Sequence, residues 1–209
     1  MNIAFLGAGA MAIALGRRFI AAGHRLVVSY SREPGKIEKT ATELGGGTQV
    51  RSPADAAQFA DIVVLATGWG GAAGALEAAG SLRDKLIWSI VTPFKADLSG
   101  LALGTTISGS EELAKRAVGA RFVAGWPPFA DVLASSSTRF GGERQSLFYC
   151  GDDPRAKHEV EPLFHVLDVD PIDAGPLYAA RFIEPAMFLL VHLAYVQKMG
   201  AVAARLLRR

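Results

Sequence analysis

A glycine-rich turn near the start of the chain constrains the fold more than any other feature. The residues Gly7-Ala8-Gly9-Ala10-Met11-Ala12 follow a short apolar run and precede a segment with helical periodicity. This G-x-G-x-x-A spacing, placed between a strand and a helix, is typical of a βαβ unit that binds a dinucleotide. Gly7 permits the tight turn, Gly9 leaves room for a pyrophosphate, and small Ala12 lets the helix pack closely. Unpaired N–H groups in the first helical turn then favour an anion.

Short apolar runs alternate with helical segments along most of the chain. This alternation predicts an α/β protein with a Rossmann-type, doubly wound and mainly parallel sheet. We expect strands at Asn2–Leu6, Arg25–Ser29, Ile62–Ala66, Leu86–Ile90, Arg121–Ala124, Leu147–Cys150 and Asp170–Asp173. We expect helices over about Ala10–Ala22, from Pro34 to Gly45, from Pro53, over Glu111–Val118, from Pro154 to Leu167, and from Leu177 onward with a kink at Pro185.

The same pattern suggests how the chain is divided. Residues 1–175 are expected to form the dinucleotide-binding domain, with a pocket-forming loop region at residues 125–145 that is rich in proline, serine and glycine. Residues 176–209 are expected to form a small C-terminal helical segment. Its apolar stripe, which includes Phe182, Met187, Leu190 and Leu193, must be covered, and we expect a homodimer through this helix.

Composition argues against several other classes of protein. The 22 basic and 20 acidic residues are scattered and give a net charge of +2, so we expect no nucleic-acid partner. The apolar stretch Ala186–Val196 is shorter than the roughly 18 residues that cross a bilayer, so we expect a buried helix and no membrane association. We also expect a cytoplasmic protein without a signal peptide, without a metal site, and with an inert, buried Cys150.

The end of the second predicted strand distinguishes NAD from NADP, because the adenosine ribose binds there. The residues are Ser29-Tyr30-Ser31-Arg32, with no carboxylate before Glu33. Arg32 can make charge-assisted contacts with a 2′-phosphate, and Ser29 or Ser31 can donate to its remaining oxygens. The sequence therefore predicts NADP(H), with an ordinary surface role for Arg32 as the alternative.

Further cofactor contacts are expected where the next strands end. Ala8, Ala10 and Met11 complete the phosphate-binding turn, while Thr67 and Trp69 follow the strand Ile62–Ala66. Thr92 and Pro93 follow the strand Leu86–Ile90. Loops at the carboxyl ends of parallel strands line the ligand crevice, so these four residues should border the nicotinamide half. Simple packing is the alternative for Trp69.

Several motifs together resemble the small NADP oxidoreductases typified by the deazaflavin-coenzyme-dependent NADP reductase. The matching residues are the glycine turn, Ser31-Arg32, Asp61 to Leu65 with Trp69, Pro93 with Lys95 to Gly100, Phe148 to Asp153 with Ala156-Lys157, and Asp173 to Leu177 with Ala180-Arg181 and Glu184-Pro185. The resemblance implies hydride transfer between NADPH and 8-hydroxy-5-deazaflavin, with FMN as another possible second substrate. This chain differs at Thr92 and at Gly125-Trp126-Pro127, both near the expected acceptor pocket, so cofactor binding carries over better than acceptor identity.

Hydride transfer between two flat rings requires stacking and orientation more than an acid or a base. Trp126, Phe129 and Phe140 can form a stacking wall or can simply pack. His192 is the one candidate catalytic side chain, with a core histidine as the alternative. Two other functions stay open: a non-catalytic NADP(H) sensor, and a small-substrate NADP-dependent dehydrogenase or imine reductase, whose relatives carry a larger helical domain.

Overall fold

The computed structural model describes all 209 residues. The seven predicted strands lie within about a residue of their predicted positions, and the short strand Gln49–Val50 was not predicted. The strands are β1 (Asn2–Leu6), β2 (Arg25–Ser29), β3 (Gln49–Val50), β4 (Ile62–Leu65), β5 (Leu86–Ser89), β6 (Arg121–Gly125), β7 (Ser146–Gly151) and β8 (Asp170–Asp173). The helices are α1 (Ala10–Ala21), α2 (Lys36–Leu44), α3 (Pro53–Phe59), α4 (Trp69–Ala78), α5 (Gly109–Arg116), α6 (Ala130–Ala134), α7 (Pro154–Val166) and α8 (Ala180–Val191).

All eight strands form one sheet in the order β3-β2-β1-β4-β5-β6-β7-β8. Every pair is parallel except β6 with β7, so the last two strands run opposite to the others. The strand order reverses direction between β1 and β4, which is where ligands bind in doubly wound sheets. The predicted Rossmann-type, mainly parallel α/β fold is therefore confirmed.

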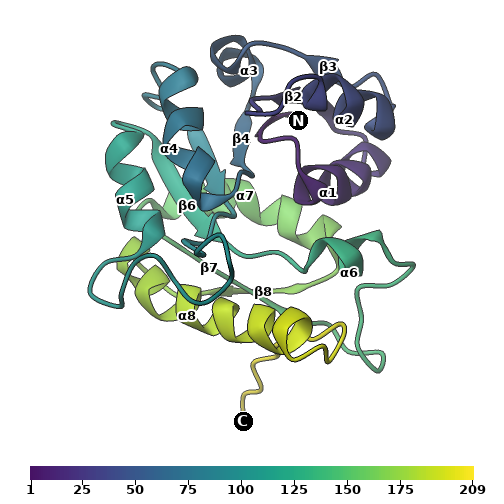
Figure 1. The fold of residues 1–209 in the computed structure, drawn as a ribbon, viewed down its shortest axis with the longest axis vertical. Coiled ribbons are helices and arrows are strands. Elements are labelled where there is room, and N and C mark those ends of the chain that lie inside the picture. The colour runs from purple at the N-terminus through teal and green to yellow at the C-terminus, as the bar shows by residue number, and fades with distance from the viewer.

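Both faces of the sheet are covered, as a parallel sheet requires. Alternate residues of β1 show this: Ile3 and Phe5 pack with α1 and α7, whereas Ala4 and Leu6 pack with α3, α4, α5 and α8. Figure 1 shows α1 and α2 on one side of the strands and α4 and α5 on the other. The carboxyl ends of β1, β2, β4 and β5 are thus held rigidly at one edge.

Local sequence signals explain where three of the eight helices begin. Ser52 and Asp153 each accept a backbone N–H bond at the start of α3 and α7, and a proline follows each of them. Ser108 and Glu111 form a reciprocal capping box at the start of α5. These side chains satisfy N–H groups that would otherwise lack partners.

Two helices were missed by the sequence interpretation. Residues 67–70 were predicted as a loop, yet α4 begins at Trp69. Its glycines lowered the apparent helical propensity, but packing against the sheet through Ala72, Ala75 and Leu76 overrides that weak preference. The short helix α6 also forms inside the expected loop region 125–145, and its Leu133 is buried.

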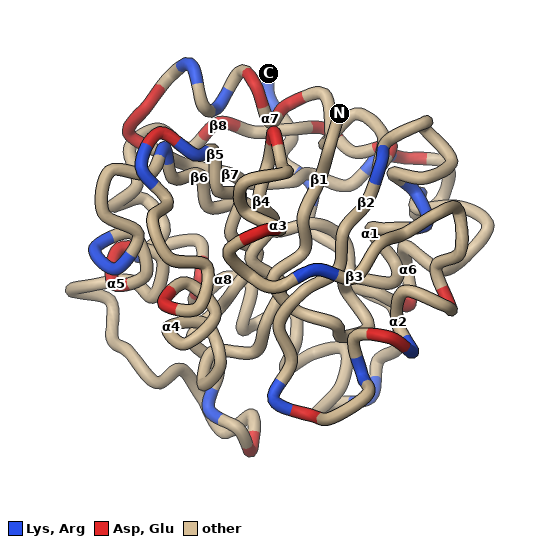
Figure 2. The backbone as a smooth tube through the Cα atoms, turned by 90° about the horizontal axis from the view of Figure 1, so that it is seen from above, with Lys and Arg blue, Asp and Glu red and all other residues tan.

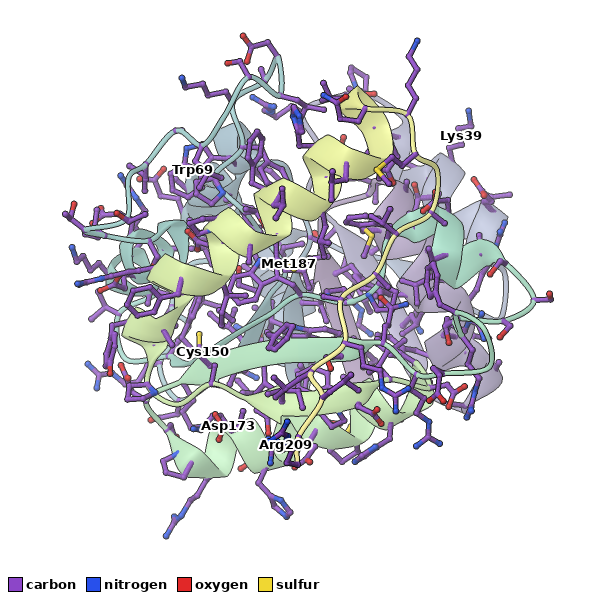
Figure 3. The ribbon with its side chains drawn as sticks, turned by 90° about the horizontal axis from the view of Figure 1, so that it is seen from below. Lys39, Trp69, Cys150, Asp173, Met187 and Arg209 are labelled. Atoms are coloured by element: carbon purple, nitrogen blue, oxygen red, sulfur yellow. The ribbon has the colours of Figure 1, made fainter.

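The C-terminal segment differs from the prediction. The helix continues through Pro185 to Val196, and residues 197–209 are not helical. The last residues pass beside β7, where Ser146 N–H donates to the Ala204 carbonyl at 2.9 Å. Figure 3 shows this tail crossing the strands to Arg209. This bond attaches the tail to β7 without forming a further strand.

The helix itself is shorter and more exposed than expected. Leu177–Val196 forms a continuous helical stretch of 20 residues that is apolar and long enough to cross a bilayer, judged by length and composition only. Only 33% of its most apolar window is buried, so the prediction of a buried helix was wrong. Its buried residues, including Ile183 and Glu184, pack against the Rossmann domain. Such a composition is also common in helices that pack on a protein core.

Candidate dinucleotide-binding site

The turn after β1 has the geometry that its glycines require. Gly7 adopts φ +131°, and its N–H donates to the Ser29 carbonyl at 2.8 Å. A β-carbon at this position would collide with the backbone carbonyl of Ala66, so only glycine fits. At Gly9, in contrast, a β-carbon would meet nothing within 4 Å. Gly9 therefore leaves open space in front of α1, as expected for a phosphate site.

Two connected hollows lie at this edge of the sheet. The first is lined by Gly7, Ala8, Gly9, Tyr30, Ser31, Arg32, Glu33, Lys36, Ala66, Thr67, Gly68 and Gly71. The second, a cleft of about 720 Å³, is lined by Gly9, Ala10, Met11, Arg32, Ala66, Thr67, Gly68, Trp69, Gly70, Ile90, Val91, Thr92, Phe94, Lys95, Ala96, Leu98 and Ala102. Because Gly9, Arg32 and Thr67 line both, the hollows form one elongated site.

The basic side chains of the first hollow are arranged for an anion. Glu33, the nearest carboxylate in sequence, pairs with Lys36 Nζ at 2.6 Å. The exposed Arg32 guanidinium is thereby left without an ion-pair partner, close to Gly71 at the start of α4. Sequence reasoning missed Lys36, although a second basic residue four positions after Arg32 was a usable signal.

The two serines predicted for the ribose end have different environments. Ser31 lines the first hollow, and its Oγ accepts a bond from Glu33 N–H at 3.0 Å. Ser29 is completely buried and its hydroxyl donates to the Arg51 carbonyl at 2.8 Å. The predicted contact of Ser29 with the cofactor is thus not supported by its position, because its donor already holds the chain after β3.

Tyr30 shapes the same hollow through an unusual backbone conformation. Its φ of +62° lies in the left-handed region, which a bulky residue rarely adopts. The ring lies against α4, with its hydroxyl 2.7 Å from where a β-carbon of Gly74 would be. Glycine at positions 71 and 74 therefore provides the space that the tyrosine ring occupies.

Thr67 and α4 form the opposite wall of the site. Thr67 Oγ1 is buried and has no hydrogen-bond partner. The helix α4 begins after Gly68 without any side-chain cap, as α1 does after Gly9. Unsatisfied buried hydroxyls and uncapped N–H groups are costly unless a polar ligand completes them. Together with the open space at Gly9, these groups fit the phosphates of a dinucleotide.

The predicted residues after β5 are not equivalent. Thr92 lines the large cleft, and its Oγ1 accepts a bond from Trp126 Nε1 at 2.9 Å. Pro93 is buried, and the β-carbon that Gly109 lacks would lie only 3.0 Å from its ring. Pro93 does not line the cleft, so its predicted contact with the cofactor is not supported by its position. It positions the loop instead.

The expected aromatic wall is also made by other residues. Trp126 is buried beneath Thr92, Phe129 packs against Tyr195 at 5.6 Å, and Phe140 pairs with Glu143 through its backbone. None of the three lines the cleft. Its apolar lining comes from Met11, Trp69, Ile90, Val91, Phe94 and Leu98. Long-range packing decides this, and no local signal in the sequence indicated it.

His192 does not reach the site. Its ring is half-buried at the end of α8, where Nε2 lies 3.1 Å from Gln197 Nε2 and the ring centroid is 6.3 Å from that of Phe188. His192 does not line the cleft, so its predicted contact with the acceptor is not supported by its position. Cys150 is buried, and burial raises the pKa of its thiol to about 12, which keeps it protonated.

A buried carboxylate attaches α8 to the domain behind the cleft. Glu184 accepts bonds from Gly109 N–H at 2.8 Å, from Ser110 N–H at 2.9 Å and from the Ser110 hydroxyl at 2.8 Å. Nearby, Arg181 forms two bonds to Glu111, and this pairing lowers the pKa of Glu111 to about 2. Burial raises the pKa of the Glu184 carboxyl, while its three donors oppose that shift.

The surface and side-chain clusters limit the chemistry. Figure 2 shows acidic and basic residues interspersed around the chain, without a face of one sign. No group of three or more His, Cys, Asp or Glu side chains is placed to hold a metal ion. What the cleft offers is an anion-binding backbone joined to an apolar surface, and these features define a Rossmann-type dinucleotide-binding protein.

Comparison with known proteins shows which family the chain resembles. Residues 2–93 match the family described as NADP oxidoreductase, coenzyme F420-dependent. A solved structure from Arthrobacter sp. FB24, described as an F420-dependent NADP reductase, is 25% identical with a TM-score of 0.85, and the match covers 99% of each chain. The predicted resemblance is confirmed: the amino-terminal part of this chain is similar to the coenzyme F420-dependent NADP oxidoreductases, and the whole chain is similar to the Arthrobacter structure.

Two further structures share the fold at lower identity. A hypothetical protein from Sinorhizobium meliloti is 23% identical, with a TM-score of 0.78 and coverage of 99% of this chain and 94% of that one. A reductive aminase from Aspergillus terreus, solved with NADPH4, cyclohexanone and allyl amine, is 18% identical with a TM-score of 0.67. This chain is covered over 94% of its length but spans only 62% of the aminase. The protein is thus an NADP(H)-binding oxidoreductase of Rossmann type.

Proposed function

We propose that this protein transfers a hydride between NADPH and a flat ring acceptor, such as 8-hydroxy-5-deazaflavin or a flavin. The observation that carries the proposal is the division of the continuous cleft. One end has backbone N–H groups without partners, Thr67 and an unpaired Arg32, while the other end is lined mainly by apolar side chains. Stacking two rings in a dry cleft favours direct hydride transfer.

Each part of this reaction has residues that can carry it out. Gly9 and the first turn of α1 hold the phosphates, Arg32 with Ser31 and Lys36 holds the 2′-phosphate, and Tyr30 forms a wall at the adenosine end. When bound, NADPH supplies the hydride, and the proton that balances the reduction comes from solvent. Met11, Ile90 and Phe94 exclude water from the region where the rings meet. No side-chain acid or base is required.

Two other functions predict different outcomes in the same assay. A sensor binds NADPH without turnover, whereas an imine reductase uses a cyclic imine instead of a ring acceptor. The chain lacks more than a third of the length of the reductive aminase that it resembles, and the helical substrate domain of that class is expected there. The acceptor cleft here is built by the loop after β5 instead.

The test is anaerobic NADPH oxidation with a panel of acceptors. We expect turnover with deazaflavin or FMN, and none with a cyclic imine such as 1-pyrroline. Arg32→Ala is expected to raise the KM for NADPH without changing the order of acceptors. Calorimetric binding of NADPH without oxidation in the presence of any acceptor would contradict the proposal and favour a sensor.

We further propose that α8 forms a homodimer interface. Tyr178, Phe182, Leu189 and Val196 are exposed at spacings that place them on one side of the helix, and Phe182 is 67% exposed. Two copies related by a twofold axis can cover both faces at once. Phe182→Glu should convert a dimer into a monomer in sedimentation experiments, and a wild-type monomer at micromolar concentration would contradict this. Cytoplasmic location and the lack of a nucleic-acid partner stay predictions.

A further inference from the structure

The loop after β5 forms a hairpin at the mouth of the large cleft. In this segment, which we call the 93–102 hairpin, Phe94 and Leu101 pair in antiparallel fashion. Lys95 N–H donates to the Gly100 carbonyl at 2.9 Å, and Ala102 N–H donates to the Pro93 carbonyl at 2.6 Å. These backbone bonds fix the position from which the Lys95 side chain extends.

The hairpin is also anchored to its surroundings. Its base, Pro93, is buried against the start of α5, and the ring of Phe94 lies 5.8 Å from that of Phe188 in α8. The side of the hairpin that lines the cleft contributes Phe94, Lys95, Ala96, Leu98 and Ala102. The hairpin is thus a fixed wall of the acceptor half.

Charge is distributed unevenly over the lining of the cleft. Arg32 and Lys95 are its only charged lining residues, and no carboxylate lines it. Arg32 also lines the first hollow, so it belongs to the ribose end. Lys95 lines only the large cleft, and its ammonium group has no hydrogen-bond or ion-pair partner. Asp97, the nearest carboxylate in sequence, accepts a bond from Ser99 N–H at 3.0 Å and does not line the cleft.

We propose that Lys95 is a specificity-determining residue, which selects acceptors that carry negative charge beside the ring over neutral acceptors with the same ring. Lys95 is exposed at the mouth of the cleft, so its unpaired ammonium group is free to attract an anion that lies beside the apolar lining. The apolar lining contacts the ring in the same way for the charged and the neutral acceptor. This inference rests on the proposed function of the cleft.

FMN and riboflavin provide a matched pair of probes, because they share the isoalloxazine ring and differ by one phosphate group. For the wild type we expect kcat/KM to be higher for FMN. Lys95→Gln should lower kcat/KM for FMN about tenfold, mainly through KM, and leave riboflavin within about twofold. Lys95→Arg should retain most of the preference, because the charge is kept.

Two controls separate this role from others. Lys115→Gln removes an exposed lysine that pairs with Glu112 on α5, away from the cleft. It should change kcat/KM for neither FMN nor riboflavin. The NADPH dissociation constant of Lys95→Gln should equal that of the wild type. Equal losses for FMN and riboflavin, or a weaker NADPH complex, would overturn the inference.

Binding measurements keep this inference distinct from the proposed function. Calorimetry of FMN and riboflavin with the NADP⁺-saturated protein does not require turnover. If FMN binds in a Lys95-dependent manner but no hydride transfer occurs, the proposed function fails and the role of Lys95 stands. If turnover occurs and Lys95→Gln binds both acceptors as the wild type does, the role of Lys95 fails and the proposed function stands.

Discussion

The amino-terminal ends of α1 and α5 have opposite environments. α1 begins after Gly9 with no side-chain cap, and open space lies in front of it. α5 begins with a capping box, and the carboxylate of Glu184 accepts from its next two backbone N–H groups. The same four unpaired donors are therefore left for a ligand in one helix and used for internal attachment in the other.

This difference separates binding from stability along the chain. In α1 the missing partners make the helix end an anion site, and the fold does not depend on filling it. In α5 the partner comes from α8, so the end of the chain is fixed to the domain. Substitutions at the first helix end should affect ligand affinity, and substitutions at the second should affect folding.

The largest effect is expected at Gly9. Its backbone, with φ −95° and ψ −175°, is extended and accepts a β-branched residue without strain. Gly9→Val should leave the free energy of unfolding within about 0.5 kcal/mol and weaken NADPH binding by at least about 100-fold, because the side chain fills the phosphate space. Thermal unfolding and calorimetry test the two effects separately. Gly7→Ala is the contrasting variant and should destabilise the fold itself.

Removing the internal partner of α5 should have the opposite pattern. Glu184→Ala leaves two buried N–H groups and the Ser110 hydroxyl without their acceptor, so the free energy of unfolding should fall by about 3 kcal/mol. NADPH affinity of the folded fraction should not change. Glu112→Ala, which breaks only an exposed pair with Lys115, should cost less than about 1 kcal/mol. Equal losses in chemical denaturation would contradict the comparison.

Arg32 resembles the amino-terminal end of α1, because its charged group also has no partner within the protein. Arg32→Ala should weaken NADPH binding by about 1.5–3 kcal/mol, the cost of lost charged hydrogen bonds, and leave NADH binding nearly unchanged. Its unfolding should match the wild type, because the guanidinium has no partner within the protein. Titrations with both cofactors provide the measurement, and equal weakening of the two would remove the assignment to a 2′-phosphate.

The smallest effect concerns acid stability at the α5 end. The pKa of Glu111 is lowered from 4.5 to about 2 by Arg181. As the pH falls through 4.5, the unfolded chain therefore takes up a proton on Glu111 while the folded chain does not. The contribution of the Glu111–Arg181 pair to the free energy of unfolding is thus present above pH 4.5 and is lost as the pH falls towards 2. Arg181→Gln should flatten the dependence of stability on pH in that window. An unchanged slope between pH 4.5 and 2 would show that the pair contributes nothing.

Much of the amino-terminal half was predictable because its signals are local. The glycine turn, the apolar runs and the absence of a carboxylate before Glu33 lie close together in sequence, and the sheet places them at one edge. The helix α4 was missed because Gly70 and Gly71 resemble a loop when propensity alone is considered. Their use becomes visible only when the Tyr30 ring is placed against them.

The acceptor half was less predictable because distant segments build it. Trp126 was a reasonable candidate for stacking, but its indole is buried and donates to Thr92, 34 residues earlier in the chain. Ser29 likewise uses its hydroxyl on Arg51. The hairpin residues Phe94 and Lys95 gave no signal until their backbone pairing fixed them at the cleft. The identity of such partners depends on tertiary packing and not on local pattern.

The contact between Tyr30 and α4 has a consequence for how this sequence can vary. A methyl group added at position 74 would lie only 2.7 Å from the phenolic oxygen of Tyr30, so alanine at this position requires the tyrosine ring to shift or to be replaced by a smaller residue. Relatives with a small residue at the first position should tolerate alanine at the second, and those with an aromatic ring should retain glycine. The shape of the adenosine end would then be inherited as a pair of residues that lie 44 positions apart in the chain.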